Sequence, residues 1–216
     1  MLKADPRARV VVAPCDHYVA HPAPLATAIL AAAERTELAP LTLVGIEPDY
    51  AETEYGWIDP GEVLGGAVRR VRGFVEKPSA ERARQLFDSG CLGNSFVMVA
   101  DGQRLWRTAE ARMPAQAAAI RSCVAAKDST DSSLTRAYEN MQHATFSRAV
   151  LENIADLGVV RARGCGFSDW GSPERVLASL RGTADVERLM SRMTSGECGL
   201  LSESTHLSLS TPTEGT

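Results

Sequence analysis

The sequence has no surplus of positive charge, no long apolar run and no signal-like start. Its 216 residues contain 23 Lys and Arg against 27 Asp and Glu, for a net charge of -4, which argues against a general nucleic-acid binder or a protein held on an anionic membrane. No apolar stretch is as long as a membrane-spanning helix, which needs about 18 residues. The first nine residues also lack the apolar core of a signal peptide. These absences predict a cytoplasmic protein with no nucleic-acid partner and no membrane association.

Paired cysteines and the common catalytic motifs are also missing. The five cysteines are odd in number, scattered and never spaced as Cys-x-x-Cys, which argues against a zinc knuckle and a disulfide framework. There is no glycine-rich phosphate loop, no His-Glu-x-x-His and no Gly-x-Ser-x-Gly. Only three of the 23 basic residues are lysines, so each lysine, Lys77 above all, is more informative than an arginine would be.

The order of apolar runs and helix-forming segments favours the α/β class. Arg9 to Pro14 is typical of a strand buried on both faces, Pro24 to Glu34 is rich in helix formers, and Leu41 to Ile46 is a second apolar strand. This β-α-β order predicts a right-handed crossover in a mostly parallel sheet. Over Glu47 to Gly66, where glycine, proline and acidic residues are frequent, we expect a long loop.

Further elements are predicted along the rest of the chain. Strands are expected over Val68 to Glu76, Asn94 to Ala100 and Leu157 to Arg163. Helices are expected from a Ser79 cap to Gly90, over Leu105 to Ala126 with a break at Met113-Pro114, and over Pro173 to Arg181. Lys127 to Ser133 is a polar connector, and the Ser- and Thr-rich tail after Ser195 is expected to be disordered. These elements predict an α/β domain over residues 1–182, followed by a short helix and the tail over residues 183–216.

Two aspartates stand just past the ends of predicted strands. Asp16 follows the first strand, and Asp169 follows the strand over Leu157 to Arg163 and its glycine turn. Open α/β sheets bind ligands at this edge, and two carboxylates there suit Mg²⁺, although both residues also fit a turn or helix cap. His17 and His21 are spaced as metal ligands, but a solvated turn before Pro22 is the favoured interpretation because no third soft ligand is evident.

Several short segments, each weak by itself, carry a resemblance when taken in order. They are Pro14-Cys15-Asp16-His17-Tyr18-Val19, Gly45-Ile46-Glu47-Pro48, Glu52-Thr53-Glu54-Tyr55-Gly56-Trp57-Ile58, Phe74-Val75-Glu76-Lys77-Pro78, Asn94-Ser95 and Gly166-Phe167-Ser168-Asp169-Trp170-Gly171-Ser172. With these segments, from residue 9 to about 180, the sequence resembles the sugar-phosphate nucleotidyltransferases and, within them, the mannose-1-phosphate guanylyltransferases. The resemblance implies a Rossmann-like sheet of mixed, mostly parallel strands flanked by helices.

The resemblance also implies a reaction and a site. Mannose 1-phosphate would attack the α-phosphorus of GTP, giving GDP-mannose and pyrophosphate. By resemblance, Asp16 and Asp169 hold Mg²⁺ and Lys77 neutralises the sugar phosphate, so these three are the expected catalytic residues. The residues expected to bind substrate are Tyr55, Gly56, Trp57, Glu76, Lys77 and Asn94.

The sequence also departs from the family pattern. The family's opening strand and its loop of the kind Gly-Gly-x-Gly-Thr-Arg have no counterpart before Arg9, so we expect an incomplete sheet that keeps the sugar-phosphate and metal half of the site. Residues 144–153 resemble an Asp-containing helix but lack the aspartate, and Asn153 stands where a lysine is usual. Gly93 and Phe96 replace the tryptophan and the glycine of Trp-Asn-Ser-Gly.

Three hypotheses follow from the resemblance and the departures. The first is a mannose-1-phosphate guanylyltransferase-like enzyme acting on GTP and mannose 1-phosphate with Mg²⁺. The second is a catalytically silent subunit that binds a sugar nucleotide or docks onto a complete enzyme. The third is a gene fragment or a mis-assigned start with no independent function. Either a homo-oligomer or a complex with a full-length homologue is compatible with the apolar surface expected beside the first strand.

Overall fold

The computed structural model describes residues 2–125, 135, 137–139, 141–181 and 183–194. Its elements are β1 Arg9–Val12, β2 Tyr18–Val19, α1 Pro22–Ala33, β3 Thr42–Ile46, β4 Gly56–Gly65, β5 Val68–Glu76, α2 Ala80–Asp88, β6 Leu92–Asp101, α3 Gly102–Arg112, α4 Pro114–Ala125, α6 Phe146–Ala149, η1 Leu151–Asn153, β7 Gly158–Ala162, β8 Phe167–Ser168, α7 Pro173–Leu180 and α8 Ala184–Thr194. The predicted connector at residues 127–133 and the tail after Ser195 both lie wholly outside the described residues.

A mixed sheet forms the centre of the fold, in the order β1-β6-β3-β7-β5-β4. The α/β class is therefore confirmed, but the expectation of mostly parallel strands is wrong. Among the described strands, β3 and β7 form the one parallel pair, and the other pairings in both sheets are antiparallel. Strands β1 and β3 do run in the same direction, as the β-α-β order predicts, yet β6 lies between them.

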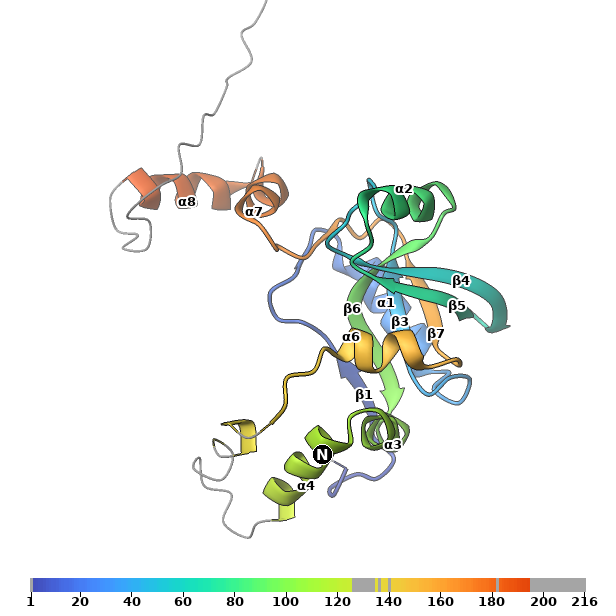
Figure 1. Ribbon diagram of the computed structural model, residues 1–216. Helices are drawn as coiled ribbons and strands as arrows, with labels where there is room; N and C mark the ends of the chain where they lie inside the picture. Colours follow the sequence, from blue (N-terminus) through green and yellow to red (C-terminus); the bar gives the residue numbers. More distant parts are fainter. Residues whose placement is uncertain (1, 126–134, 136, 140, 182, 195–216) are drawn as a thin grey trace, which may run out of the picture. The chain divides into compact units, whose positions relative to one another are not determined.

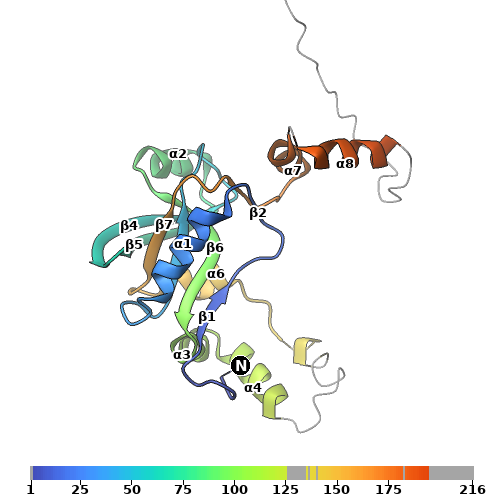
Figure 2. The same ribbon diagram turned by 180° about the vertical axis from the view of Figure 1, so that it is seen from behind.

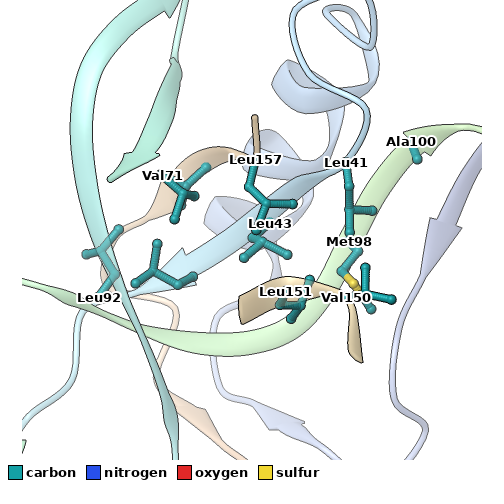
Figure 3. Close-up of a cluster of buried hydrophobic side chains, with 11 residues drawn as sticks. Leu41, Leu43, Val71, Leu92, Met98, Ala100, Val150, Leu151 and Leu157 are labelled. Atoms are coloured by element: carbon teal, nitrogen blue, oxygen red, sulfur yellow. The ribbon is translucent and has the colours of Figure 1, made fainter. Parts of the chain in front are cut away.

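Helices cover both faces of this sheet. Helix α1 packs across β3, β6 and β7 on one face (Figure 2). On the other face, α6 lies in front of the sheet (Figure 1), and the residues that follow it, Val150 and Leu151 at the start of η1, bury their side chains against the strands. Figure 3 shows these two side chains together with Leu43 and Leu157 in the cluster between the strands and the α6–η1 segment. Burial of this apolar surface on both faces is the main stabilising term of the fold.

Strand β6 bends in its middle and serves three partners. Its first residues pair with β4, at Trp57 with Gly93, and its last residues pair with β1, while β3 lies along its other edge. The Ser95 hydroxyl is buried, donates to the carbonyl of Val44 over 2.6 Å and accepts from the amide of Val97 over 3.1 Å. Next to it, Phe96 has a φ of +59°. The bend turns the start of β6 away from β1 and closes the sheet on itself through β4.

Strand β1 lies at the edge of the sheet and is mostly exposed. Its only partner among the described strands is β6, and the side chains of Val11 and Val12 are 47% and 39% exposed. The expectation of a strand buried on both faces is therefore wrong. A short apolar run is equally compatible with an edge strand, because burial depends on neighbours that the run itself does not specify.

A long hairpin replaces most of the loop expected over Glu47 to Gly66. Strand β4 occupies residues 56–65 of that stretch and pairs with β5, with register shifts at Pro60 and between Val63 and Gly65. Tertiary pairing thus overrides the turn-forming composition, and Pro60 falls where the ladder is irregular.

The helices agree more closely with the sequence. The Ser79 hydroxyl accepts from the Arg82 amide at the start of α2, as its cap position predicts. The predicted break at Met113-Pro114 is confirmed, because α3 ends at Arg112 and α4 begins at Pro114. No helix in the described part of the chain is both long and apolar enough to cross a membrane.

The chain divides into two compact units, Met1–Asp169 and Trp170–Thr216. The first contains the sheet and both of its helical layers. In the second, Ser172 caps α7 by accepting from the Arg175 amide over 3.4 Å, Pro173 occupies the first turn, and α8 follows. The first unit therefore ends earlier than the boundary expected after residue 182, because β8, paired with β2, is its last strand.

The close packing of β3 against its neighbours gives a test of the fold. A Cβ at Gly45 would lie 2.7 Å from Leu92 Cδ1 and 2.9 Å from Leu92 Cβ, whereas one at Gly73 meets nothing nearer than 3.9 Å. We expect Gly45→Ala to lower the free energy of unfolding by about 1–3 kcal/mol through overpacking, and Gly73→Ala to change it by less than about 0.5 kcal/mol. Urea unfolding measures both, and equal effects would contradict this arrangement of β3 and β6.

Candidate functional site

A two-residue ladder brings the predicted metal ligands near each other. Tyr18 of β2 pairs with Ser168 of β8, so Asp16 and Asp169 extend from neighbouring ends of the two strands. His17 lies between them. Burial lowers the pKa of the His17 imidazole below its ordinary value, while the carboxylates of Asp16 and Asp169 and the backbone of Ser95 act in the opposite direction. Both aspartates are therefore within electrostatic reach of one imidazole.

The carboxylates present fit a magnesium ion better than a zinc ion. The Asp16 side chain is 78% exposed and its Oδ1 lies 3.9 Å from His17 Nε2. Within the described ranges, no group of three or more His, Cys, Asp or Glu side chains gathers as a metal-binding cluster. Mg²⁺ needs only one or two carboxylates, since waters and substrate phosphates complete its shell, whereas zinc sites use three or four protein ligands. His21 does not join this pair, because it stands at the start of α1 with its amide bonded to the Cys165 carbonyl.

A second group of predicted residues meets around Gly56. Gly56 is paired with Glu76 in the β4–β5 ladder. A Cβ at Gly56 would lie 2.8 Å from Glu76 Oε2, 2.8 Å from Phe74 Cζ and 3.4 Å from Asn94 Cβ. The absence of a side chain at this position thus lets the Glu76 carboxylate and the Asn94 side chain approach the β4 backbone from two other strands.

The polar groups of this cluster are poised to bind a ligand. Asn94 is buried, and its Oδ1 accepts from the Phe96 amide over 3.1 Å, which leaves its Nδ2 as a donor. In the part of the chain that the structure describes, neither that Nδ2 nor the Glu76 carboxylate has a hydrogen-bond partner. One amide donor and one carboxyl group beside an open backbone can bind two neighbouring hydroxyl groups.

Lys77 follows directly and has a strained backbone. Its φ is +44°, a conformation that costs an L-residue roughly 1–2 kcal/mol. Its amide donates to the Tyr55 carbonyl over 3.2 Å, and its Nζ lies 3.1 Å from Glu54 Oε2. Strain of this kind at a non-glycine residue is common where a side chain must be aimed at a ligand. Glu54 is a site neighbour that sequence reasoning missed, because it occupies the variable position of its motif.

Trp57 differs from its neighbours. Its side chain is fully buried among Ala83, Leu86 and Cys91, and its Nε1 donates to the Glu52 carbonyl over 2.8 Å. The expectation that Trp57 lines a sugar pocket therefore needs correction: the indole anchors α2 to β4 and fixes the turn that carries Tyr55. The alternation of side chains along β4 places Trp57 on the side of α2. The sequence did not predict this orientation, because a loop was expected at this position.

Phe167 connects the two groups of residues. Its ring centroid lies 4.9 Å from that of His17 and 6.2 Å from that of Tyr55, edge-on in both cases. The half-buried Tyr55 ring thus faces the same aromatic side chain as the imidazole between the aspartates. Sequence reasoning named the motif that contains Phe167 but gave the residue no role.

The segment over residues 144–153 also reaches the site. Glu152 Oε1 accepts from the Glu76 amide over 3.3 Å, so η1 touches the end of β5. Asn153, at the position where a lysine was expected, donates from Nδ2 to the Arg148 carbonyl over 2.6 Å. Ser147 is buried, and its hydroxyl has no hydrogen-bond partner within the described residues. These side chains serve the local turn and add no positive charge to the site.

The chain is similar in sequence to a family of enzymes and to several curated proteins. The family model described as nucleotidyl transferase matches residues 1–162. A mannose-1-phosphate guanylyltransferase of Sinorhizobium fredii is 29% identical over 195 residues, which is 87% of this chain and 37% of that protein. One from Escherichia coli K12 is 31% identical over 181 residues, covering 79% of this chain and 37% of that protein. The chain thus spans little more than a third of the length of these curated relatives.

Solved structures agree in fold. A crystal structure described as mannose-1-phosphate geranyltransferase from Thermus thermophilus matches with a TM-score of 0.73 and 25% identity, over 83% of this chain and 52% of that chain. A mannose-6-phosphate isomerase from Helicobacter pylori matches with a TM-score of 0.62 and 19% identity, over 77% of this chain and 66% of that one. The second similarity concerns the fold alone.

The strain at Lys77 gives a test that is independent of any ligand. Lys77→Gly and Lys77→Ala both remove the ion pair with Glu54, but only glycine adopts a positive φ without cost. We expect Lys77→Gly to be more stable than Lys77→Ala by about 1 kcal/mol, measured by urea unfolding. Equal stability of the two variants would show that the backbone at this position is relaxed.

Proposed function

The chain belongs to the nucleotidyl transferase family, and we propose on that premise that it binds mannose 1-phosphate and transfers a guanylyl group to it from GTP. The products would be GDP-mannose and pyrophosphate. The observation that carries this proposal is the convergence of Gly56, Glu76 and Asn94 beside Lys77 at one end of the sheet. The names of the curated relatives supply the sugar and the base.

The proposed reaction does not require a general base. A phosphate monoester has its second pKa near ~6, so the attacking oxygen is already ionised at neutral pH. The protein has to hold the two phosphates in line and stabilise the charge that develops between them. Sites of this kind therefore work by position and electrostatics, and the residues around Gly56 are of the types that such work requires.

Each residue has a proposed role. Glu76 and the Nδ2 of Asn94 would bind sugar hydroxyls over the open backbone of Gly56, and Tyr55 would flank the sugar. Lys77 would leave Glu54 and pair with the sugar phosphate. Asp16 and Asp169 would hold Mg²⁺, which when bound would neutralise phosphate charge.

A second candidate function is binding of a sugar nucleotide without turnover. The observation that favours it is the segment over residues 144–153, where Asn153 is bonded to the Arg148 carbonyl and Ser147 carries no charge. Two charges that the family resemblance implies for this segment are thus missing from the site, while the sugar-binding cluster is unaffected. Such a chain would bind the sugar nucleotide without transferring a guanylyl group, and any transfer would be carried out by a partner protein.

Binding of the sugar phosphate tests what both candidates share. With Mg²⁺ present, we expect Gly56→Ala to weaken mannose 1-phosphate binding by about tenfold or more, because the added methyl displaces the Glu76 carboxylate from the pocket. Gly73→Ala, on the neighbouring strand with room for a methyl group, is the matched control. Isothermal titration calorimetry measures both dissociation constants.

The metal half is tested in the same titration. Asp169→Asn should abolish the enhancement of binding by Mg²⁺, and Asp88→Asn on α2 should retain it. Binding by wild type that is unaffected by Gly56→Ala would overturn the proposed sugar pocket, and binding that does not depend on Mg²⁺ would overturn the metal role of Asp169.

Turnover separates the two candidates. Release of pyrophosphate from GTP and mannose 1-phosphate, lost in Lys77→Ala, is expected of the transferase. The binding protein would take up mannose 1-phosphate or GDP-mannose with no pyrophosphate above the level of Lys77→Ala. A coupled pyrophosphate assay on the wild-type chain and this variant decides between the candidates.

A further inference from the structure

A polar hollow lies outside the cluster around Gly56. It has a volume of about 450 Å³, and the β4–β5 hairpin (Figure 1), the turn after α2 and the end of β7 surround it. Its lining consists of Pro60, Ala67, Arg69, Ser89, Gly90, Arg161 and Arg163. None of these residues belongs to the site proposed for nucleotidyl transfer.

Three of the lining residues are arginines, and the carboxylates near them neutralise only part of their charge. Arg161 Nη1 and Arg163 Nε lie 3.1 Å and 3.4 Å from the same oxygen of Glu47. Arg69 donates from Nε to the Gly61 carbonyl over 2.8 Å, which orients its guanidinium and leaves both Nη groups. Within the described residues Arg69 has no carboxylate within ion-pair distance. Two of the three guanidiniums thus share one carboxylate, and the third has none.

The arrangement suits a phosphate group more than an internal ion-pair network. A network that only stabilises the fold pairs each guanidinium with a carboxylate, as Arg72 does with Asp59 and Arg70 does with Glu62 and Asp156 on the same hairpin. Around the hollow, two guanidiniums instead compete for one oxygen, and the third faces the space with free donors. Planar guanidinium forks match the oxygens of a phosphate in pairs.

We propose that the hollow lined by Arg69, Arg161 and Arg163 is a second anion site, which binds the phosphate group of a phosphorylated metabolite. Its volume lies in the range of small-molecule pockets and exceeds what inorganic phosphate alone would fill. Glu47 acts as the internal competitor: it occupies Arg161 and Arg163 in the absence of ligand and lowers the affinity of the site. This proposal does not depend on the proposed transferase activity.

The competition provides a variant that should gain affinity. In a Lys77→Ala background, which removes the phosphate contact of the other site, inorganic phosphate is titrated by isothermal titration calorimetry against chloride at equal ionic strength. We expect Arg69→Gln to weaken phosphate binding by about tenfold. We expect Glu47→Gln to tighten it by about two- to fivefold, because the two guanidiniums lose their competitor.

Arg84→Gln is the matched control, because Arg84 is an exposed arginine on α2 whose partner is Asp88. If Arg84→Gln weakens binding as much as Arg69→Gln does, phosphate responds only to the overall charge and the proposal is overturned. Unchanged or weaker binding by Glu47→Gln also overturns it. If Arg69→Gln does not fold, the Glu47→Gln variant decides alone, since a gain in affinity cannot arise from unfolding. The two sites are separated if Arg69→Gln abolishes phosphate binding in the Lys77→Ala background, while Arg69→Gln in a chain that keeps Lys77 still binds mannose 1-phosphate.

Discussion

One hydrogen bond, from the Ser95 hydroxyl to the carbonyl of Val44, joins β6 to β3 at the point where β6 bends. Along one edge of β6, its last residues pair with β1 and its first residues pair with β4. At this bend Phe96 has a positive φ, at a cost that its packing against Phe146 helps to offset. Asn94 stands just before this bend, next to the residues of β6 that pair with β4, and its side chain lies beside Gly56.

The candidate site therefore combines precise backbone placement with local strain. Asn94 comes from the bent strand, Glu76 from the end of the hairpin, and the aspartates from the short β2–β8 ladder. Phe167 packs against the rings on both sides and holds the two groups together. Lys77 has a backbone conformation that glycine would adopt more easily, as Phe96 does. At Lys77 and Phe96 the strained backbone lowers the stability of the fold, and in return it fixes the direction in which the side chain points.

The parts of the molecule that the sequence predicts well are those determined by neighbours in the chain. The limits of β5, the Ser79 cap and the break before Pro114 depend on local propensities, and the motif residues around Gly56 could be named because their types and spacing form a pattern. Strand β4 and the edge position of β1 could not be derived, since both are decided by which distant strand lies alongside. The burial of Trp57 and the pairing of Lys77 with Glu54 depend on that same register. For this reason the resemblance named segments that the structure brings together around Gly56, but it did not anticipate the burial of Trp57.

The strand order has a consequence for the time course of folding. Among the described strands, the β4–β5 hairpin is the one ladder between strands that follow each other in the chain. Strand β3 instead pairs with β7, where Thr42 meets Gly158 more than a hundred residues later. A sheet whose central pair is this remote folds slowly, because most of the chain must be ordered before the pair can form. The hairpin is the most local ladder of the described sheet, so we expect it to form first and to set Gly56 opposite Glu76 before β7 joins the sheet.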